Sequence, residues 1–216
     1  MIFINMEAPA ASPEVSQRLG AHPRSHLRPG ISSPEQDGAR RALALLRQPV
    51  CIASVLGLAL TSSTIAFLRF GWTLRLWCLV PLLVALAIIL ILDFRAKIIP
   101  DVLTLPAIAY ALVVAAFMKS PPLGAALLGM VAGGGIVFLL VVASRGAIGG
   151  GDIKLMAMLG AALGWKGALA VLAFSQLAGA LVALTLLIAG RGRKHDLFPI
   201  GAIISLLGTV MLLGQP

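Results

Sequence analysis

The stretch LGAALLGMVAGGGIVFLLVVASRGAIGGGD occupies residues 123–152 and joins an uncharged apolar run to three consecutive glycines and an aspartate. The apolar part, 123–143, is long enough to cross a bilayer, because a spanning helix needs about 20 mostly apolar residues. Each glycine costs about 1 kcal/mol relative to alanine in a helix interior. The run 149–151 therefore predicts a backbone that turns sharply or is approached closely by another group.

Six further stretches qualify or nearly qualify as membrane spans: about 50–68, 76–92, 102–118, 153–164, 167–190 and 198–214. The stretch 153–164 is short, since about twelve helical residues rise only about 18 Å. It is either a half-span or is extended by its neighbours. With 59% hydrophobic and 12% charged residues, the chain is unlike a soluble domain, which has about 25% charged residues. We expect an all-α, polytopic transmembrane bundle of about six to seven helices.

The 17 lysines and arginines, which give a net charge of +9, follow a pattern typical of membrane topology. Positive residues gather in cytoplasmic loops. With a cytoplasmic N-terminus, only Arg69, Arg75, Lys119 and Lys166 fall on the other side. The charge therefore points to a lipid bilayer as the partner and not to nucleic acid. We expect residues 1–47 to form a disordered, basic cytoplasmic tail and residues 48–216 to form the transmembrane domain.

Only four acidic residues, Asp93, Asp101, Asp152 and Asp196, follow Arg47. A carboxylate among membrane spans costs several kcal/mol unless it meets a partner or water, so such residues are functional candidates. The orientation above places all four on the cytoplasmic face. Structural alternatives remain: Asp93 could pair with a lysine one turn on, Asp152 could be a helix N-cap, Asp101 could cap the third span, and Asp196 could balance charge in a loop.

Asp93 and Asp152 are expected at the same membrane depth, on the ends of separate helices, which suggests an aspartyl protease pair. In that mechanism an ionised aspartate takes a proton from water while a protonated one donates a hydrogen bond to the scissile carbonyl. Water is available at the membrane surface. No His/Cys/carboxylate cluster has ligand spacing, and the two cysteines, Cys51 and Cys78, sit in apolar stretches. We therefore expect no metal and no cofactor.

Three motifs then resemble the prepilin peptidases, membrane aspartyl proteases that process type IV pilin and type II secretion pseudopilin precursors. Residues 149–152 resemble that family's Gly-x-Gly-Asp signature. Residues 93–95 (Asp-Phe-Arg), with 99–101 (Ile-Pro-Asp) and 103–104 (Leu-Thr), resemble its first motif. Residues 198–201 (Phe-Pro-Ile-Gly) resemble its closing element. The resemblance covers about residues 76–214.

The resemblance implies that Asp93 and Asp152 are the catalytic pair of a Gly-x-Gly-Asp membrane aspartyl endopeptidase. It implies that Gly149, Gly150 and Gly151 shape the site. Lys154 could orient Asp152, bind an acidic group of the substrate, or extend to the membrane surface.

The expected substrates are prepilin or pseudopilin precursors, cut after their basic leader at the cytoplasmic face of a bacterial inner membrane. Because the chain has no Cys-x-x-Cys motif, the resemblance is to the short, peptidase-only Flp/Tad-type members without methyltransferase activity.

Two other functions stay open from the sequence. A cation-coupled transporter could bind its ion at Asp93 and Asp152, with the glycines forming a discontinuous helix. A non-catalytic membrane protein of pilus or secretion assembly would need neither carboxylate. The sequence predicts no oligomeric state.

Overall fold

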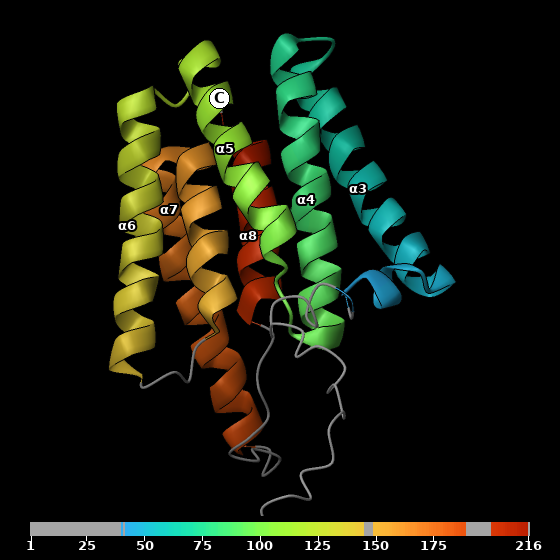
Figure 1. The fold of residues 1–216 in the computed structure, drawn as a ribbon, viewed down its shortest axis with the longest axis vertical. Helices are drawn as coiled ribbons and strands as arrows, with labels where there is room; N and C mark the ends of the chain where they lie inside the picture. Colours follow the sequence, from blue (N-terminus) through green and yellow to red (C-terminus); the bar gives the residue numbers. More distant parts are fainter. Residues whose placement is uncertain (1–39, 41, 145–148, 189–199, 216) are drawn as a thin grey trace, which may run out of the picture. The chain divides into compact units, whose positions relative to one another are not determined.

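The computed structural model describes residue 40 and residues 42–144, 149–188 and 200–215, and the regular elements in these ranges are helices. Five of them are long and apolar enough to cross a membrane, which confirms the predicted helical membrane bundle. Another helix, α8, is apolar but shorter. Figure 1 shows them in order: α3 (Pro49–Phe70), α4 (Leu74–Ala96), α5 (Asp101–Met118), α6 (Leu123–Ala143), α7 (Gly150–Ile188) and α8 (Ile200–Gly214).

Several sequence predictions concern residues outside these ranges. The predicted tail is described only at Arg40 and residues 42–47, of which 42–46 are helical. Asp196 and the first two residues of the motif 198–201 also lie outside the described residues. The predictions for these positions stay predictions.

The helix α7 is broken at Gly164, whose φ of 73° and ψ of 176° are non-helical. Glycine adopts a positive φ without the steric cost that a side chain would bring. The break divides α7 into 150–163 and 165–188, which correspond to the predicted stretches 153–164 and 167–190. The first segment is extended at its N-terminal side, yet at about 1.5 Å per residue it remains shorter than the roughly 30 Å hydrocarbon core.

The helices alternate in direction, so that several helix ends gather at one end of the bundle (Figure 1). There α4 ends and α5, α7 and α8 begin. We call this the carboxylate end, because Asp93 lies in the last turn of α4 and Asp152 in the first turn of α7. The break at Gly164 lies at the opposite end.

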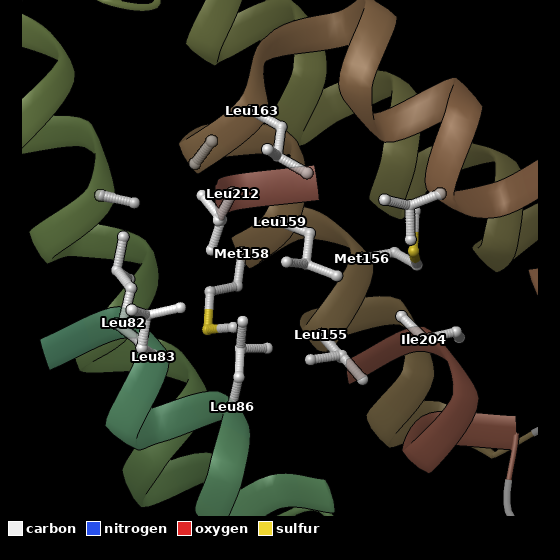
Figure 2. Packing of buried hydrophobic residues seen from close by; sticks show 14 of the residues in the cluster. Leu82, Leu83, Leu86, Leu155, Met156, Met158, Leu159, Leu163, Ile204 and Leu212 are labelled. Atoms are coloured by element: carbon white, nitrogen blue, oxygen red, sulfur yellow. The ribbon is translucent and has the colours of Figure 1, made fainter. Parts of the chain in front are cut away.

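The first segment of α7 is the centre of the core. Its residues Leu155, Met156, Met158 and Leu159 are at most 1% exposed. Figure 2 shows these side chains between α4 and α8, and the labelled residues packed around them are Leu82, Leu83, Leu86, Leu163, Ile204 and Leu212. The segment that carries Asp152 is therefore enclosed by protein and not by lipid.

The closest helix contact joins α6 to the first segment of α7 through glycine. A Cβ atom added at Gly160 would lie 2.0 Å from the carbonyl oxygen of Gly129, and one added at Gly129 would lie 2.2 Å from that of Gly160. Gly133 makes a similar approach, with 2.7 Å to the carbonyl oxygen of Met156. Small residues at such interfaces let helix backbones pack closely in a membrane. This contact depends on the absence of a side chain.

We expect Gly160→Ala to destabilise the protein by at least about 2 kcal/mol, because the obstructing atoms belong to the backbone of α6 and cannot rotate away. Thermal unfolding of the purified protein in detergent measures the effect. The matched control is Gly135→Ala, since a Cβ there meets nothing within 4 Å. The control should keep or raise the unfolding temperature, because alanine is the better helix former. Equal unfolding temperatures for the two variants would contradict the assigned contact.

Candidate active site

The structure brings Asp93 and Asp152 together from two different helices. A Cβ atom added at Gly201 would lie 2.9 Å from Cγ of Asp93 and 3.1 Å from Oδ1 of Asp152. Two points that are each about 3 Å from a third are at most about 6 Å apart, a range in which two carboxyl groups interact. Both residues are buried, at 6% and 7% exposure. Gly201, in the first turn of α8, thus lies beside both carboxyl groups, and its lack of a side chain leaves room for them.

The first turn of α8 also orients Asp93. The backbone N–H of Ala202 donates a hydrogen bond to Oδ2 of Asp93 at 2.6 Å. The first N–H groups of a helix have no partner within the helix, so the aspartate satisfies one of them. Residues 109 positions apart in the sequence are joined by this bond.

The alternative of a salt bridge between Asp93 and Lys97 is not what the structure forms. Lys97 instead ends α4 as its C-cap in a left-handed conformation, with φ 54° and ψ 39°. Its backbone N–H donates to the carbonyl oxygen of Asp93 at 3.0 Å. The Asp93 side chain is left facing α8 and Asp152.

The glycine run does not form the predicted sharp turn. Gly150 and Gly151 are the first residues of α7, and neither has a positive φ among the described residues. The N–H of Asp152 already donates to the carbonyl oxygen of Gly149 at 3.1 Å, which is why the chain is helical here. Asp152 is consequently inside the first turn and is not the N-cap.

The other expectation for the run, close approach by another group, is confirmed at Gly151. A Cβ there would lie 2.8 Å from Cβ of Ile99. Within the described part of the chain, a Cβ added at Gly150 would meet nothing within 4 Å, and one added at Gly149 would lie 3.9 Å from Oδ2 of Asp152. The run is therefore packed at one glycine and open at the other two.

A cavity of about 230 Å³ lies over the two carboxylates. It has room for several water molecules, which occupy about 30 Å³ each in the liquid. Its lining combines the two acids and Lys97 with glycines and two isoleucines, so the surface is partly polar and partly apolar. Its lining residues are Asp93, Lys97, Ile99, Gly149, Gly150, Gly151, Asp152, Ile200 and Gly201.

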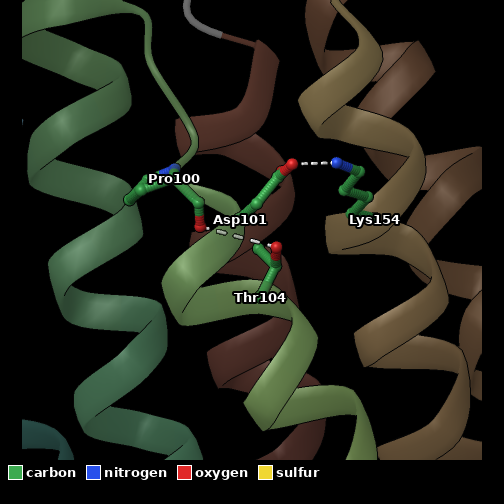
Figure 3. Close-up of polar contacts among 4 residues, drawn as sticks. All are labelled: Pro100, Asp101, Thr104 and Lys154. Atoms are coloured by element: carbon green, nitrogen blue, oxygen red, sulfur yellow. Dashed lines mark hydrogen bonds and ion pairs between the residues drawn. The ribbon is translucent and has the colours of Figure 1, made fainter. Parts of the chain in front are cut away.

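Lys154 lies two residues after Asp152 but its ammonium group pairs with another acid. Nζ of Lys154 forms an ion pair with Oδ2 of Asp101, at the start of α5 (Figure 3). The side chains are 38% and 18% exposed. The N-cap of α5 is Pro100, so the expectation that Asp101 caps this helix is wrong. The carbonyl oxygen of Pro100 accepts a hydrogen bond from Oγ1 of Thr104 at 3.5 Å (Figure 3).

Sequence reasoning missed three contributors to this site: Ile99, Gly201 as the spacer between the acids, and the N–H of Ala202. Signals existed for two of them, since Ile99 stands in the motif 99–101 and Gly201 closes the motif 198–201, but neither signal revealed the contacts that these residues make. In the described ranges, no group of three or more His, Cys, Asp and Glu residues could hold a metal ion.

Comparison with known proteins places this site in a family. Residues 80–184 match the type IV leader peptidase family. The chain is 34% identical to the prepilin leader peptidase/N-methyltransferase of Aeromonas salmonicida (strain A449) over 162 residues, which cover 72% of this chain and 55% of that protein. The protein of the same name from Bacillus subtilis (strain 168) is 34% identical over 146 residues, 65% of this chain and 56% of the relative.

A third relative of that name, from Myxococcus xanthus (strain DK1622), is 38% identical over 130 residues, 56% of this chain and 38% of the relative. The chain thus spans about half the length of the first two relatives. No solved structure matches the chain. Asp93, Asp101, Asp152 and Lys154 all fall within the matched residues, and the chain belongs to the type IV leader peptidase family.

Proposed function

We propose that this protein is an aspartic endopeptidase in which Asp93 and Asp152 are the catalytic pair. The observation that carries the proposal is the convergence of two buried carboxylates on Gly201, beneath a cavity of about 230 Å³. Two carboxyl groups at most about 6 Å apart, with room for water, support aspartyl protease chemistry, which uses two neighbouring acids. The names of the relatives, prepilin leader peptidases, agree with it.

The proposed reaction uses one water molecule held between the carboxylates. The ionised aspartate takes a proton from the water as its oxygen attacks the scissile carbonyl carbon. The protonated aspartate donates its hydrogen to the carbonyl oxygen. Breakdown of the tetrahedral intermediate then breaks the C–N bond. The departing amine takes the proton that the first aspartate received from water, and the second aspartate regains its proton from a hydroxyl of the intermediate, which leaves a carboxylic acid product and restores the pair. Gly149 and Gly150 line the cavity and, among the residues that the structure describes, meet no close neighbour apart from Asp152, which leaves space for an extended substrate backbone.

The proposed substrates are prepilin or pseudopilin precursors, cut between a basic leader and an apolar helix at the cytoplasmic face of a bacterial inner membrane. Two features support this choice. The carboxylate end has Arg95, Lys97 and Lys154, as expected for a cytoplasmic face, and a substrate helix in the bilayer would present its leader at that depth.

We also propose that the chain acts as a peptidase of the Flp type without methyltransferase activity. Its 216 residues contain two cysteines and no Cys-x-x-Cys motif. Mass spectrometry of the processed pilin N-terminus tests this proposal, and an N-terminus methylated by this protein would contradict it.

Asp93→Asn and Asp152→Asn should each lower cleavage of a co-expressed prepilin at least about 100-fold, since each removes one partner of the proton transfer. The double variant should lose little more than either single variant, because the two acids act as a unit. Immunoblotting of the shortened pilin measures the rate. Asp196→Asn, which removes an acid predicted to lie in a loop, is the matched control. Leader removal at the wild-type rate in either single variant would rule out the pair.

Gly201→Ala should lower cleavage by about 100-fold, because the new methyl group displaces the carboxyl groups from their reacting positions. The matched control on the same helix is Gly214→Ala, where a Cβ meets nothing within 4 Å. Cleavage rates are compared at equal amounts of folded, purified protein. If Gly201→Ala cleaves as fast as Gly214→Ala, the spacer role is wrong.

The orientation is testable without any substrate. In a Cys51→Ser/Cys78→Ser background, Arg95→Cys should react with a membrane-impermeant maleimide only after the cells are opened. Lys166→Cys, at the other end of the bundle, should react in intact cells. Both parent residues are exposed. The reverse pattern would place the carboxylate end outside the cytoplasm.

A further inference from the structure

Residues 97–100 link α4 to α5, and together with Asp101, the first residue of α5, they contact the helix ends that form the site. The link begins four residues after Asp93, and its first residue is tied to the Asp93 carbonyl by a backbone hydrogen bond of 3.0 Å. Its last residue, Asp101, opens α5. We call residues 97–101 the connector.

Ile99, in the middle of the connector, is wedged between α7 and α8. Added Cβ atoms would lie 2.8 Å from its Cβ at Gly151 and 2.9 Å from its Cδ1 at Gly201. These two glycines flank the acids directly: Gly151 precedes Asp152, and Gly201 separates the two carboxyl groups. One apolar side chain therefore sets how closely the first turns of α7 and α8 approach the end of α4.

Asp101 contacts α7 on the C-terminal side of Asp152. Its carboxylate pairs with Lys154, two residues after Asp152 on the first turns of α7 (Figure 3). The pair is partly buried, at 18% exposure for Asp101 and 38% for Lys154. Asp152 thus lies between two contacts, at Gly151 and at Lys154, that both lead back to the same connector.

We propose that the connector positions Asp152 against Asp93, with Ile99 and the Asp101–Lys154 ion pair as positioning residues. Lys154 then acts through Asp101 and does not bind the substrate. The expected effect of the connector on cleavage rests on the proposed peptidase function, whereas its expected effect on the separation of Asp93 and Asp152 does not. The connector fixes the separation of two acids that belong to helices otherwise joined only through packing.

The catalytic test measures kcat and KM for cleavage of a recombinant prepilin by the full-length protein. Lys154→Met and Asp101→Leu should lower kcat by about 10- to 100-fold, with KM changed less than about threefold, because misplaced acids slow chemistry without weakening binding. Asp101→Asn should keep most activity, since its amide oxygen still accepts a hydrogen bond from Lys154. The charge-exchanged variant Asp101→Lys/Lys154→Asp should regain most of the kcat lost in the single variants.

The matched control is Lys166→Met, the same substitution at the far end of the bundle, which should leave both constants unchanged. A rise in KM for Lys154→Met, without recovery in the charge-exchanged variant, would overturn the proposal and indicate direct contact between Lys154 and the substrate.

The geometric test does not need activity. In the Cys51→Ser/Cys78→Ser background, Asp93→Cys/Asp152→Cys is treated with a short bifunctional thiol reagent. Adding Lys154→Met or Ile99→Ala should slow cross-linking severalfold, and adding Lys166→Met should not. Unchanged cross-linking in both connector variants would overturn the positioning role, whether or not the protein cleaves a prepilin. Slowed cross-linking together with no cleavage by the wild-type protein would refute the proposed function and support the positioning role.

Discussion

The contact between the backbones of α6 and α7 at Gly129 and Gly160 is the constraint from which the rest of the arrangement follows. In a bilayer, lipid tails are as apolar as leucine side chains, so helices associate through close packing and not through a hydrophobic driving force. Here the approach is so close that any Cβ at either glycine would overlap the opposite carbonyl group. The first segment of α7 is thereby held against α6 on one side, which leaves its opposite side for α4 and α8.

This placement fixes the depth of Asp152. Four residues after Gly160, the helix breaks at Gly164, whose added Cβ would lie 3.3 Å from Pro121, so the far end of the segment is anchored as well. The segment then presents its first turn at the carboxylate end. On the opposite side Leu159 packs against Gly208 of α8, and the same helix brings Gly201 and the N–H of Ala202 to Asp93. Glycine contacts therefore set the depth of the site, and the connector sets the position of Asp152 against Asp93.

The sequence was sufficient for the spans and for the acids, because both depend on composition along the chain. Lengths of apolar sequence predict membrane helices directly. The scarcity of acids drew attention to four aspartates, and the expected membrane depth together with the family resemblance selected Asp93 and Asp152. The sequence was insufficient for predicting the Asp101–Lys154 ion pair and the hydrogen bond from Ala202 to Asp93, because these contacts join residues 53 and 109 positions apart. For the glycine run the sequence left a sharp turn and a close approach as alternatives, and only the structure shows that Ile99 makes the close approach at Gly151 while α7 begins at Gly150.

The glycines of this chain consequently serve two opposite purposes. At some positions another part of the protein fills the space where a side chain would be, so that an added Cβ would overlap its atoms; these positions are Gly129, Gly151, Gly160 and Gly201. At Gly149 and Gly150 the space stays open toward the cavity. Closed glycines bring helix ends near enough for two carboxyl groups to meet, and open ones keep those groups reachable. A site built from buried acids needs both, because packing alone would seal it and openness alone would leave the acids apart.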